Sequence, residues 1–347
     1  MDTQSSVEYD YFRHDVVDVK GMGKKIVKKN VFNAESPIMN LRFDPEDTMI
    51  AAVCGDGSLK IFHLHSDQLK VKVKTGKPNI NVPATCLRWR PTAFSASTKN
   101  VIVTGGADGQ LVHWHVTTGK ELNRIEEKGN QINSIDYNKD GSRFITSGSD
   151  NKIRLYDESE KSLVSEYKGS EWQDPGHNNR IFSLKFLPDD PNLFISGGWD
   201  TNVHIWDIRQ GKSVGGFIGP KIGGDALDYQ NGHILTGANR SRDQIQIWDF
   251  KQRTLIRTVD WNYGKKEDTG AFVYGCQFSK CNSDSIIAGS FGLNEVKLFD
   301  QNRDYQPYGY VTGFKKGIYS VDFGNFSNKF AFGGEDGGIF VMSVTAA

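Results

Sequence analysis

The stretch SGGWDTNVHIWDI, residues 196–208, contains two Trp-Asp pairs seven residues apart. Its glycine-rich start is typical of a turn, and the alternating apolar and polar residues that follow are typical of a half-buried strand. Variants of this stretch recur along the chain, and each ends on a large side chain. These closing side chains are Phe62, Trp114, Tyr156, Trp206, Trp248, Phe299 and Met342. Because they lie 42 to 52 residues apart, the chain is predicted to consist of seven copies of one structural unit.

A second signature precedes each of these turns, namely a short strand that ends in an aromatic residue. The seven copies are IMNLRF (38–43), ATCLRW (84–89), INSIDY (132–137), IFSLKF (181–186), GDALDY (224–229), VYGCQF (273–278) and IYSVDF (318–323). A third short strand and a looser fourth strand complete each unit. Four strands at a period of about 40 to 50 residues form the blade of a β-propeller. We therefore predict an all-β fold, a closed seven-bladed β-propeller of four-stranded antiparallel blades.

On these seven registered copies, the chain resembles the WD-repeat family over residues 24–344. Some copies depart from the pattern: Arg242 stands where blade five should have its turn Asp, and blade seven ends on Met342. In the family, a strand before the first full repeat completes the last blade, so the resemblance implies that residues 24–32 close the ring. The predicted organisation is one propeller over residues 24–347, preceded by a flexible tail of residues 1–23.

The resemblance also implies a role for four residues of blade four. Family blades link a turn Asp, a loop His, a strand Ser and the closing Trp in a hydrogen-bonded chain. In this sequence the four are Asp200, His177, Ser196 and Trp206, and Trp114 and Trp248 take the Trp place in blades two and five. A Ser, a His and an Asp together are also the set of a hydrolase, but a Ser bonded to a buried Trp N–H is not free to be a nucleophile. The prediction is a structural role.

Trp199 belongs to the other Trp-Asp pair and has no such role. It precedes the turn Asp, at a position that projects toward solvent and that holds small or polar residues in most other blades. A large exposed aromatic residue on a loop is a candidate contact residue. The alternative is that Trp199 folds over its own blade.

Other aromatic and arginine residues are expected on the same face. In the family, the second position of each first strand faces the rim of the central channel, and three of these positions are aromatic here. Long loops before blades two, four and six lie on this face too. Since aromatic residues and Arg are enriched at interface centres, we predict a partner-binding surface. Its residues are Trp172, Arg180, Phe182, Trp199, Arg240, Arg242, Tyr274 and Tyr319.

Composition argues against several other classes of function. The 42 basic and 42 acidic residues cancel, so the neutral balance disfavours a nucleic-acid or phospholipid binder. The four cysteines lack a CxxC spacing and do not suggest a disulfide framework. No run of about 18 apolar residues occurs. We expect a soluble intracellular protein that does not insert into membranes.

Signals for chemistry are weak. The pairs His63/His65 and His113/His115 each place two imidazoles on one strand face, but no third ligand is evident and no metal is expected. Asp225 is a lone carboxylate among the channel positions, whereas acid–base catalysis needs a partner of different pKa. We predict no catalytic residues, no cofactor and no small-molecule substrate.

The favoured function is a non-enzymatic scaffold or adaptor that binds protein or peptide partners on the loop-rich face, as a subunit of a larger assembly. The alternatives are a propeller enzyme with a site at the channel mouth, and a phospholipid or nucleic-acid binder. The expected location is cytoplasmic, with a cytoskeletal or ciliary assembly as the preferred setting.

Overall fold

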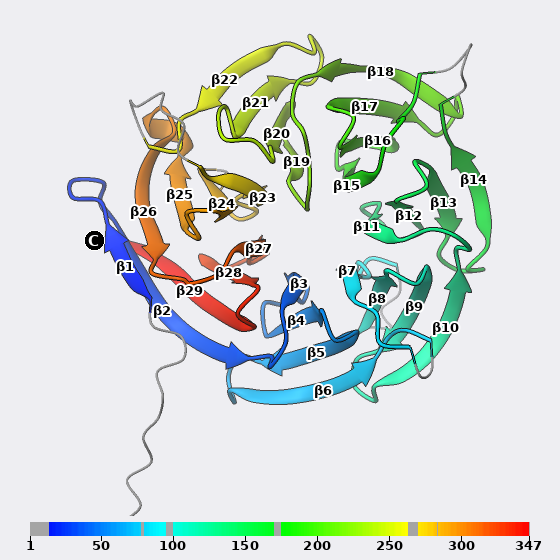
Figure 1. The fold of residues 1–347 in the computed structure, drawn as a ribbon, viewed down its shortest axis with the longest axis horizontal. Helices are drawn as coiled ribbons and strands as arrows, with labels where there is room; N and C mark the ends of the chain where they lie inside the picture. Colours follow the sequence, from blue (N-terminus) through cyan, green and yellow to red (C-terminus); the bar gives the residue numbers. More distant parts are fainter. Residues whose placement is uncertain are drawn as a thin grey trace, which may run out of the picture.

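The computed structural model describes residues 14–77, 80–94, 100–169, 175–262, 270–282 and 284–346. In these ranges seven antiparallel sheets surround a central channel, with the first strand of each blade nearest the centre and the last at the rim (Figure 1). The prediction of an all-β, seven-bladed propeller is confirmed. Short alternating segments separated by glycine-rich turns favour this arrangement, because each strand buries one face against the next blade.

The strands of each blade follow one another along the chain. Blade one comprises β3 (Ile38–Phe43), β4 (Met49–Cys54), β5 (Ser58–His63) and β6 (Gln68–Lys74). Blade two comprises β7 (Ala84–Trp89), β8 (Val101–Gly106), β9 (Gln110–His115) and β10 (Lys120–Glu126). Blade three comprises β11 (Ile132–Tyr137), β12 (Arg143–Gly148), β13 (Ile153–Asp157) and β14 (Leu163–Tyr167). Blade four comprises β15 (Ile181–Leu187), β16 (Asp190–Gly198), β17 (Asn202–Asp207) and β18 (Lys212–Ile218).

The remaining blades include the ring closure. Blade five comprises β19 (Leu227–Gln230), β20 (His233–Gly237), β21 (Ile245–Asp249) and β22 (Leu255–Val259). Blade six comprises β23 (Phe272–Phe278), β24 (Ser285–Phe291), β25 (Val296–Asp300) and β26 (Gln306–Thr312), with the short 3-10 helix η1 (Gln301–Arg303) before β26. Blade seven comprises β27 (Ile318–Phe323), β28 (Lys329–Gly334), β29 (Gly338–Ala346) and β2 (Lys24–Asn33).

The pairing of β2 with β29 closes the ring. Its register runs antiparallel from Lys24 opposite Ala346 to Asn33 opposite Gly338, so the outer strand of blade seven comes from the start of the chain (Figure 1). Main-chain hydrogen bonds thus join segments more than 300 residues apart in sequence. Within the described residues, there is no helix of the length and apolar character that a membrane span requires.

The segment before β2 is not a tail throughout. The strand β1 (Asp15–Asp18) pairs with β26 and adds a fifth strand to blade six. Asp18 also accepts a 2.8 Å hydrogen bond from the backbone N–H of Ile26, and Val16 packs against the apolar cluster of blades six and seven. The expectation of a flexible tail over residues 1–23 is therefore wrong for these residues, and residues 1–13 lie outside the described ranges.

The closing tryptophans lie between blades as expected. Trp206 is 1% exposed, and Trp114 and Trp248 are also buried. The indole N–H of Trp114 donates to Thr104 Oγ1 at 3.0 Å, and that of Trp248 donates to Thr236 Oγ1 at 3.1 Å. Each large aromatic ring is thereby buried with its one polar group satisfied.

In the central channel, Asp225 of blade five contacts residues of blades one and two. Strand β19 begins at Leu227, three residues later than predicted, and Asp225 points into the channel. Its carboxylate accepts from Arg88 Nη2 at 3.1 Å, from Asn40 Nδ2 at 3.0 Å and from Arg42 Nη2. On the side of the channel where the first strands end, Asp225, Arg42 and Arg88 border a cavity of about 490 Å³. Asp225 therefore serves as an ionic tie between blade five and blades one and two.

Candidate functional site

The hydrogen-bonded chain of blade four has the geometry that the family resemblance implies. The indole N–H of Trp206 donates to Ser196 Oγ at 2.7 Å, and Ser196 Oγ lies 2.7 Å from His177 Nε2. His177 Nδ1 lies 2.8 Å from Asp200 Oδ2. An indole N–H can only donate, so the Ser196 hydroxyl donates to Nε2 and the Nδ1–H of His177 donates to the carboxylate.

The same chain explains why these residues are structural. Burial tends to raise the pKa of Asp200, but the hydrogen bond and charge of His177, together with backbone N–H donors from Asn202 and Asn178, outweigh it. The pKa is therefore lowered, which keeps the carboxylate ionised. Ser196 is fully buried and holds the Trp206 indole. A nucleophilic serine needs a free hydroxyl facing substrate, and Ser196 has neither property.

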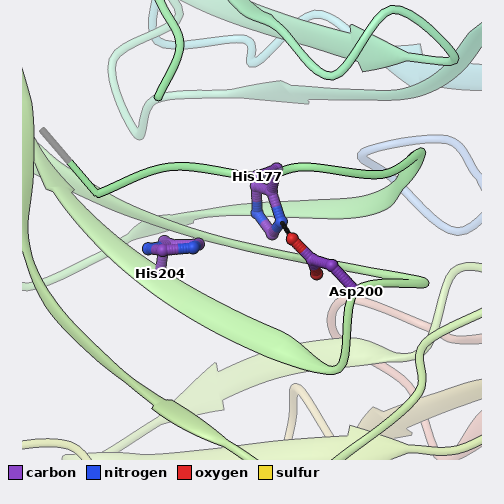
Figure 2. Close-up of side chains that lie close together, drawn as sticks. All are labelled: His177, Asp200 and His204. Carbon is purple, nitrogen blue, oxygen red and sulfur yellow. Dashed lines mark hydrogen bonds and ion pairs between the residues drawn. The ribbon is translucent and has the colours of Figure 1, made fainter. Parts of the chain in front are cut away.

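His204 lies beside this chain and completes a group whose ligand atoms are within 4.8 Å of one another: His177, Asp200 and His204 (Figure 2). Such a set could in principle hold a metal ion. However, one nitrogen of His177 accepts from Ser196 and the other donates to Asp200, so no lone pair of His177 is free. Burial and the neighbouring His177 lower the pKa of His204 to about 4, and its Nδ1 lies 3.3 Å from Ser213 Oγ. We interpret the group as structural packing.

The other histidine pairs are also engaged within the fold. His113 is fully buried with Nε2 at 3.1 Å from Glu158 Oε2, and His115 Nδ1 lies 2.8 Å from Thr118 Oγ1. His63 Nδ1 accepts from the backbone N–H of His65 at 3.3 Å. None of these is grouped with two further ligands within the described ranges.

Trp199 stands at the turn between β16 and β17 and is 39% exposed. Its backbone is fixed, because its N–H donates to the carbonyl of Arg180 at 3.0 Å. Its ring centre lies 5.1 Å from that of Phe182, the channel-rim residue of the same blade. The ring therefore packs partly on its own blade and still presents more than a third of its surface to solvent.

Two cations flank the Trp199 ring. The guanidinium carbon of Arg180 lies 5.9 Å from the ring centre and Lys221 Nζ lies 5.7 Å from it. Both distances are near the limit of a cation–π contact, so each contact is weak. Among the described residues, neither cation forms an ion pair with a carboxylate, and the Arg180 guanidinium lies 3.4 Å from Gln131 Oε1.

A second group of aromatic residues lies on blades six and seven. The ring centres of Tyr274 and Tyr319 are 5.7 Å apart, and Phe291 lies 6.3 Å from Tyr274. The Tyr319 hydroxyl donates to Glu335 at 3.1 Å, and burial together with this carboxylate raises the Tyr319 pKa to about 12. The Tyr319 hydroxyl is therefore neutral at physiological pH.

Gly223 and Asn239 connect the two aromatic groups. A Cβ placed on Gly223 would be 3.3 Å from Trp199 Nε1 and 3.2 Å from Asn239 Nδ2, so only glycine lets both approach without adjustment. Asn239 Nδ2 in turn donates to the Tyr274 hydroxyl at 3.4 Å. We use the name aromatic face for the surface formed by Phe182, Trp199, Tyr274, Phe291 and Tyr319.

The remaining residues of the predicted surface differ in availability. Arg240 donates to Gln246 Oε1 at 2.8 Å and to the carbonyls of Asp243 and Gly219 at 2.9 and 3.1 Å, so its donors hold neighbouring loops together. Arg242 is exposed. Trp172 lies outside the described residues.

Phe291 was missed from the sequence. It is 42% exposed at the end of β24, in a turn whose sequence departs from the other repeats. The signal that could have found it was its place in the repeat, since Phe291 stands where blade four has Trp199 and most other blades have small or polar residues.

Comparison with known proteins supports the repeat assignment. The sequence pattern described as "WD domain, G-beta repeat" matches residues 119–157 and 170–207. The pattern described as "Anaphase-promoting complex subunit 4 WD40 domain" matches residues 15–92. The closed ring of seven blades defines the class of protein, a seven-bladed β-propeller. Together with these matches, it makes the chain a member of the WD-repeat family.

The curated relatives are distant. The chain is 22% identical to E3 ubiquitin-protein ligase COP1 of Pisum sativum, over 74% of this chain and 37% of that protein. It is 26% identical to eukaryotic translation initiation factor 3 subunit I of Bombyx mori, over 41% of this chain and 43% of that protein. It is 24% identical to actin-interacting protein 1 of Drosophila melanogaster, over 63% of this chain and 33% of that protein. The chain thus spans less than half the length of each relative.

Proposed function

We propose that this protein is a non-enzymatic scaffold or adaptor that binds a protein or peptide partner on the aromatic face. The observation that carries the proposal is that the partly exposed Trp199 lies close to the Tyr274–Tyr319 pair. Trp199 lies beside Gly223 and Asn239, and Asn239 donates to the Tyr274 hydroxyl. Trp199 and Phe291 are exposed, and Phe182, Tyr274 and Tyr319 are half-buried. A group of accessible aromatic residues on a rigid frame is typical of a binding surface.

Two further observations support a scaffold. The relatives' names describe a ubiquitin-protein ligase, a subunit of a translation initiation factor and an actin-interacting protein, and each role involves other proteins. In the channel, the carboxylate of Asp225 is shared by Arg42 and Arg88, so it is tied up in ion pairs and is a poor general base. The actin-interacting relative fits our proposal of a cytoplasmic assembly of the cytoskeleton or cilium.

The test is Trp199→Ala, compared with Phe326→Ala as a matched control. Phe326 is a 79% exposed aromatic residue between β27 and β28, at the opposite end of the first strands. Each variant of the full chain is expressed in cells with a proximity-labelling tag, and labelled proteins are quantified against the native chain. Truncating a central anchor typically costs about 2 kcal/mol, or roughly thirtyfold in affinity.

We expect Trp199→Ala to lose specific labelled partners while its melting temperature stays close to that of the native chain. Phe326→Ala should retain those partners. If Trp199→Ala keeps every partner and melts at a lower temperature, Trp199 is a packing residue and the proposed face is wrong.

A further inference from the structure

The charges around Trp199 indicate the chemistry of its partner. The Arg180 guanidinium and Lys221 Nζ lie 5.9 and 5.7 Å from the centre of the indole ring. No carboxylate among the described residues forms an ion pair with either. Arg242 adds a third exposed cation in the next turn, which Arg240 holds against Gly219. In this turn the exposed Asp243 follows Arg242, so Arg180 and Lys221 are the cations on which the argument depends.

Trp199 itself offers both an apolar surface and an unused donor. Trp199 is 39% exposed. No hydrogen bond joins its indole N–H to another described residue, and Nε1 lies beside Gly223, where a Cβ would be 3.3 Å away. A bound group that presents an oxygen acceptor beside an apolar side chain would satisfy the indole N–H and cover the ring. A carboxylate is complementary to the two cations, and charge-assisted hydrogen bonds are about twice as strong as neutral ones.

The loop that carries Lys221 is held rigidly. The carbonyl of Lys221 accepts from the N–H of Asn239 at 2.7 Å, and the N–H of the buried Ile222 donates to Gly198 at 3.1 Å. A few residues further on, Asp225 fixes the loop across the channel through Arg42. Because the backbone beneath the site is already ordered, little of the binding free energy is lost in ordering it.

We propose that the Trp199 surface recognises a short acidic peptide segment of its partner, in which an Asp or Glu carboxylate contacts Arg180 and Lys221 while a neighbouring apolar side chain packs on Trp199. This inference rests on the proposed function and specifies its partner. An acidic peptide and an anionic phospholipid headgroup would both complement the two cations. Only the peptide also supplies an apolar side chain for the Trp199 ring, so we favour the peptide.

The first experiment is a display selection of random dodecapeptides on the immobilised full chain, with counter-selection on Trp199→Ala. Peptides that require Trp199 and are enriched in Asp or Glu beside an apolar residue would support the proposal. Peptides that require Trp199 but are neutral or basic would overturn it and leave the proposed function intact. If no selected peptide depends on Trp199, the proposed function itself fails.

The second experiment measures the affinity of the best selected peptide for the double variant Arg180→Gln, Lys221→Gln. We expect a loss of at least tenfold at low salt and a weaker dependence on salt than in the native chain, since exposed charge pairs are screened. The control is Lys139→Gln with Lys251→Gln, two exposed lysines on the opposite face with the same change of charge, which should leave affinity unchanged.

Equal losses in both double variants would mean that only net charge matters and would overturn the assignment to Arg180 and Lys221. Co-sedimentation with phosphatidylserine vesicles tests whether the anion that binds Arg180 and Lys221 is a lipid headgroup and not a peptide carboxylate. If vesicle binding depends on Arg180 and Lys221 while no acidic peptide is selected, the surface is a membrane contact and the proposal is wrong.

Discussion

Blades three and four use different hydrogen-bond arrangements to connect the loop residue, the strand hydroxyl and the closing aromatic residue of the repeat. In blade four, His177 connects Asp200 to Ser196, and Ser196 accepts from Trp206, so the groups form a relay in a line. In blade three, a single carboxylate is the centre. Glu127 accepts from Tyr156 Oη at 3.0 Å, from Asn130 Nδ2 at 2.7 Å and from Thr146 Oγ1.

The two blades also differ in charge at one position of their third strands. Arg154 in β13 forms ion pairs with Glu127 at 3.1 Å and with Asp150 of the turn. His204 occupies the corresponding place in β17, two residues before the closing aromatic, and is buried and neutral. The comparison teaches that the repeat requires the aromatic residue and the turn Asp to be connected, and that either a linear relay through a histidine or a buried ionic hub can connect them.

The largest effect that separates the two blades should come from Glu127→Ala. It removes the carboxylate that accepts from Thr146 and Tyr156 and leaves the buried Arg154 with one fewer counter-charge. Breaking a buried ion pair typically costs about 3–5 kcal/mol. We expect this loss in the free energy of unfolding from urea titration, and a loss below about 1 kcal/mol would contradict the hub.

Trp206→Ala should have a similar effect in blade four, for a different reason. The ring is 1% exposed and packs near Tyr167 and Phe194, so its removal empties an aromatic site in the core. Such truncations cost about 3–5 kcal/mol. The control is Trp199→Ala in the same blade, and similar losses for the two variants would contradict the division between a fold tryptophan and a surface tryptophan.

His177→Ala should cost about 1–3 kcal/mol, because it removes one donor to Asp200 and the acceptor of the Ser196 hydroxyl. The cost should be less than for Glu127→Ala, because Asp200 keeps the N–H donors of Asn178 and Asn202 and no buried cation loses a counter-charge. Parallel urea titrations of the two variants test the ranking. A His177→Ala loss greater than that of Glu127→Ala would mean that the relay of blade four is the stronger device.

The sequence predicted blade four far better than blade three, and the reason is chemical. The four residues of the relay keep the family's residue types, so their roles could be transferred position by position. Glu127 stands in the polar run EEKGN, where a buried acid cannot be told from a solvated one without its partner Arg154. Charge pairs across a fold leave no local signal.

The same limit applies to long-range features elsewhere. The period of the repeat predicted the ring and its number of blades, because it reflects contacts between neighbours. The four residues of β1 are too few for a strand pattern, and their pairing with β26 depends on the return of the chain. Asp225 was identified as a channel carboxylate, but its ties to Arg42 and Arg88 join blades that are far apart in sequence.

The response to pH should distinguish the two blades further. An unfolded histidine has a pKa near 6.5, whereas burial lowers that of His204 to about 4. Between these values the unfolded chain binds the extra proton, so stability is present above about pH 6.5 and is lost as the pH falls toward 4. His204 should therefore cost on the order of 2 kcal/mol between pH 7 and pH 5, while Arg154 stays charged and contributes no such loss.

His204→Leu should reduce the loss of stability between pH 7 and pH 5 by that amount. Some loss of stability between pH 7 and pH 5 will remain in this variant, because burial also lowers the pKa of His113. Urea titrations at the two pH values provide the measurement, and His65→Leu, which changes an exposed histidine, is the control. Identical pH dependence in the native chain and in His204→Leu would show that His204 titrates normally.

The smallest predicted effect tests the difference between a relay and a hub directly. Tyr156→Phe removes one of several donors to Glu127 and leaves the carboxylate with Arg154, Thr146 and Asn130, so it should cost only about 0.5–1.5 kcal/mol. Ser196→Ala also deletes a single hydroxyl, but that hydroxyl serves two partners.

Removing the Ser196 hydroxyl strands the Trp206 N–H and the Nε2 of His177 in a buried site, where each unsatisfied group carries a desolvation penalty of about 1–3 kcal/mol. Ser196→Ala should thus cost more than Tyr156→Phe although both variants lose one oxygen. Urea titrations at pH 7 compare the two. The double variant should show additive losses, because the hydroxyls belong to different blades and share no partner. If Tyr156→Phe costs as much as Ser196→Ala, the alternative donors do not compensate for the lost hydroxyl, and blade three is as linear a chain as blade four.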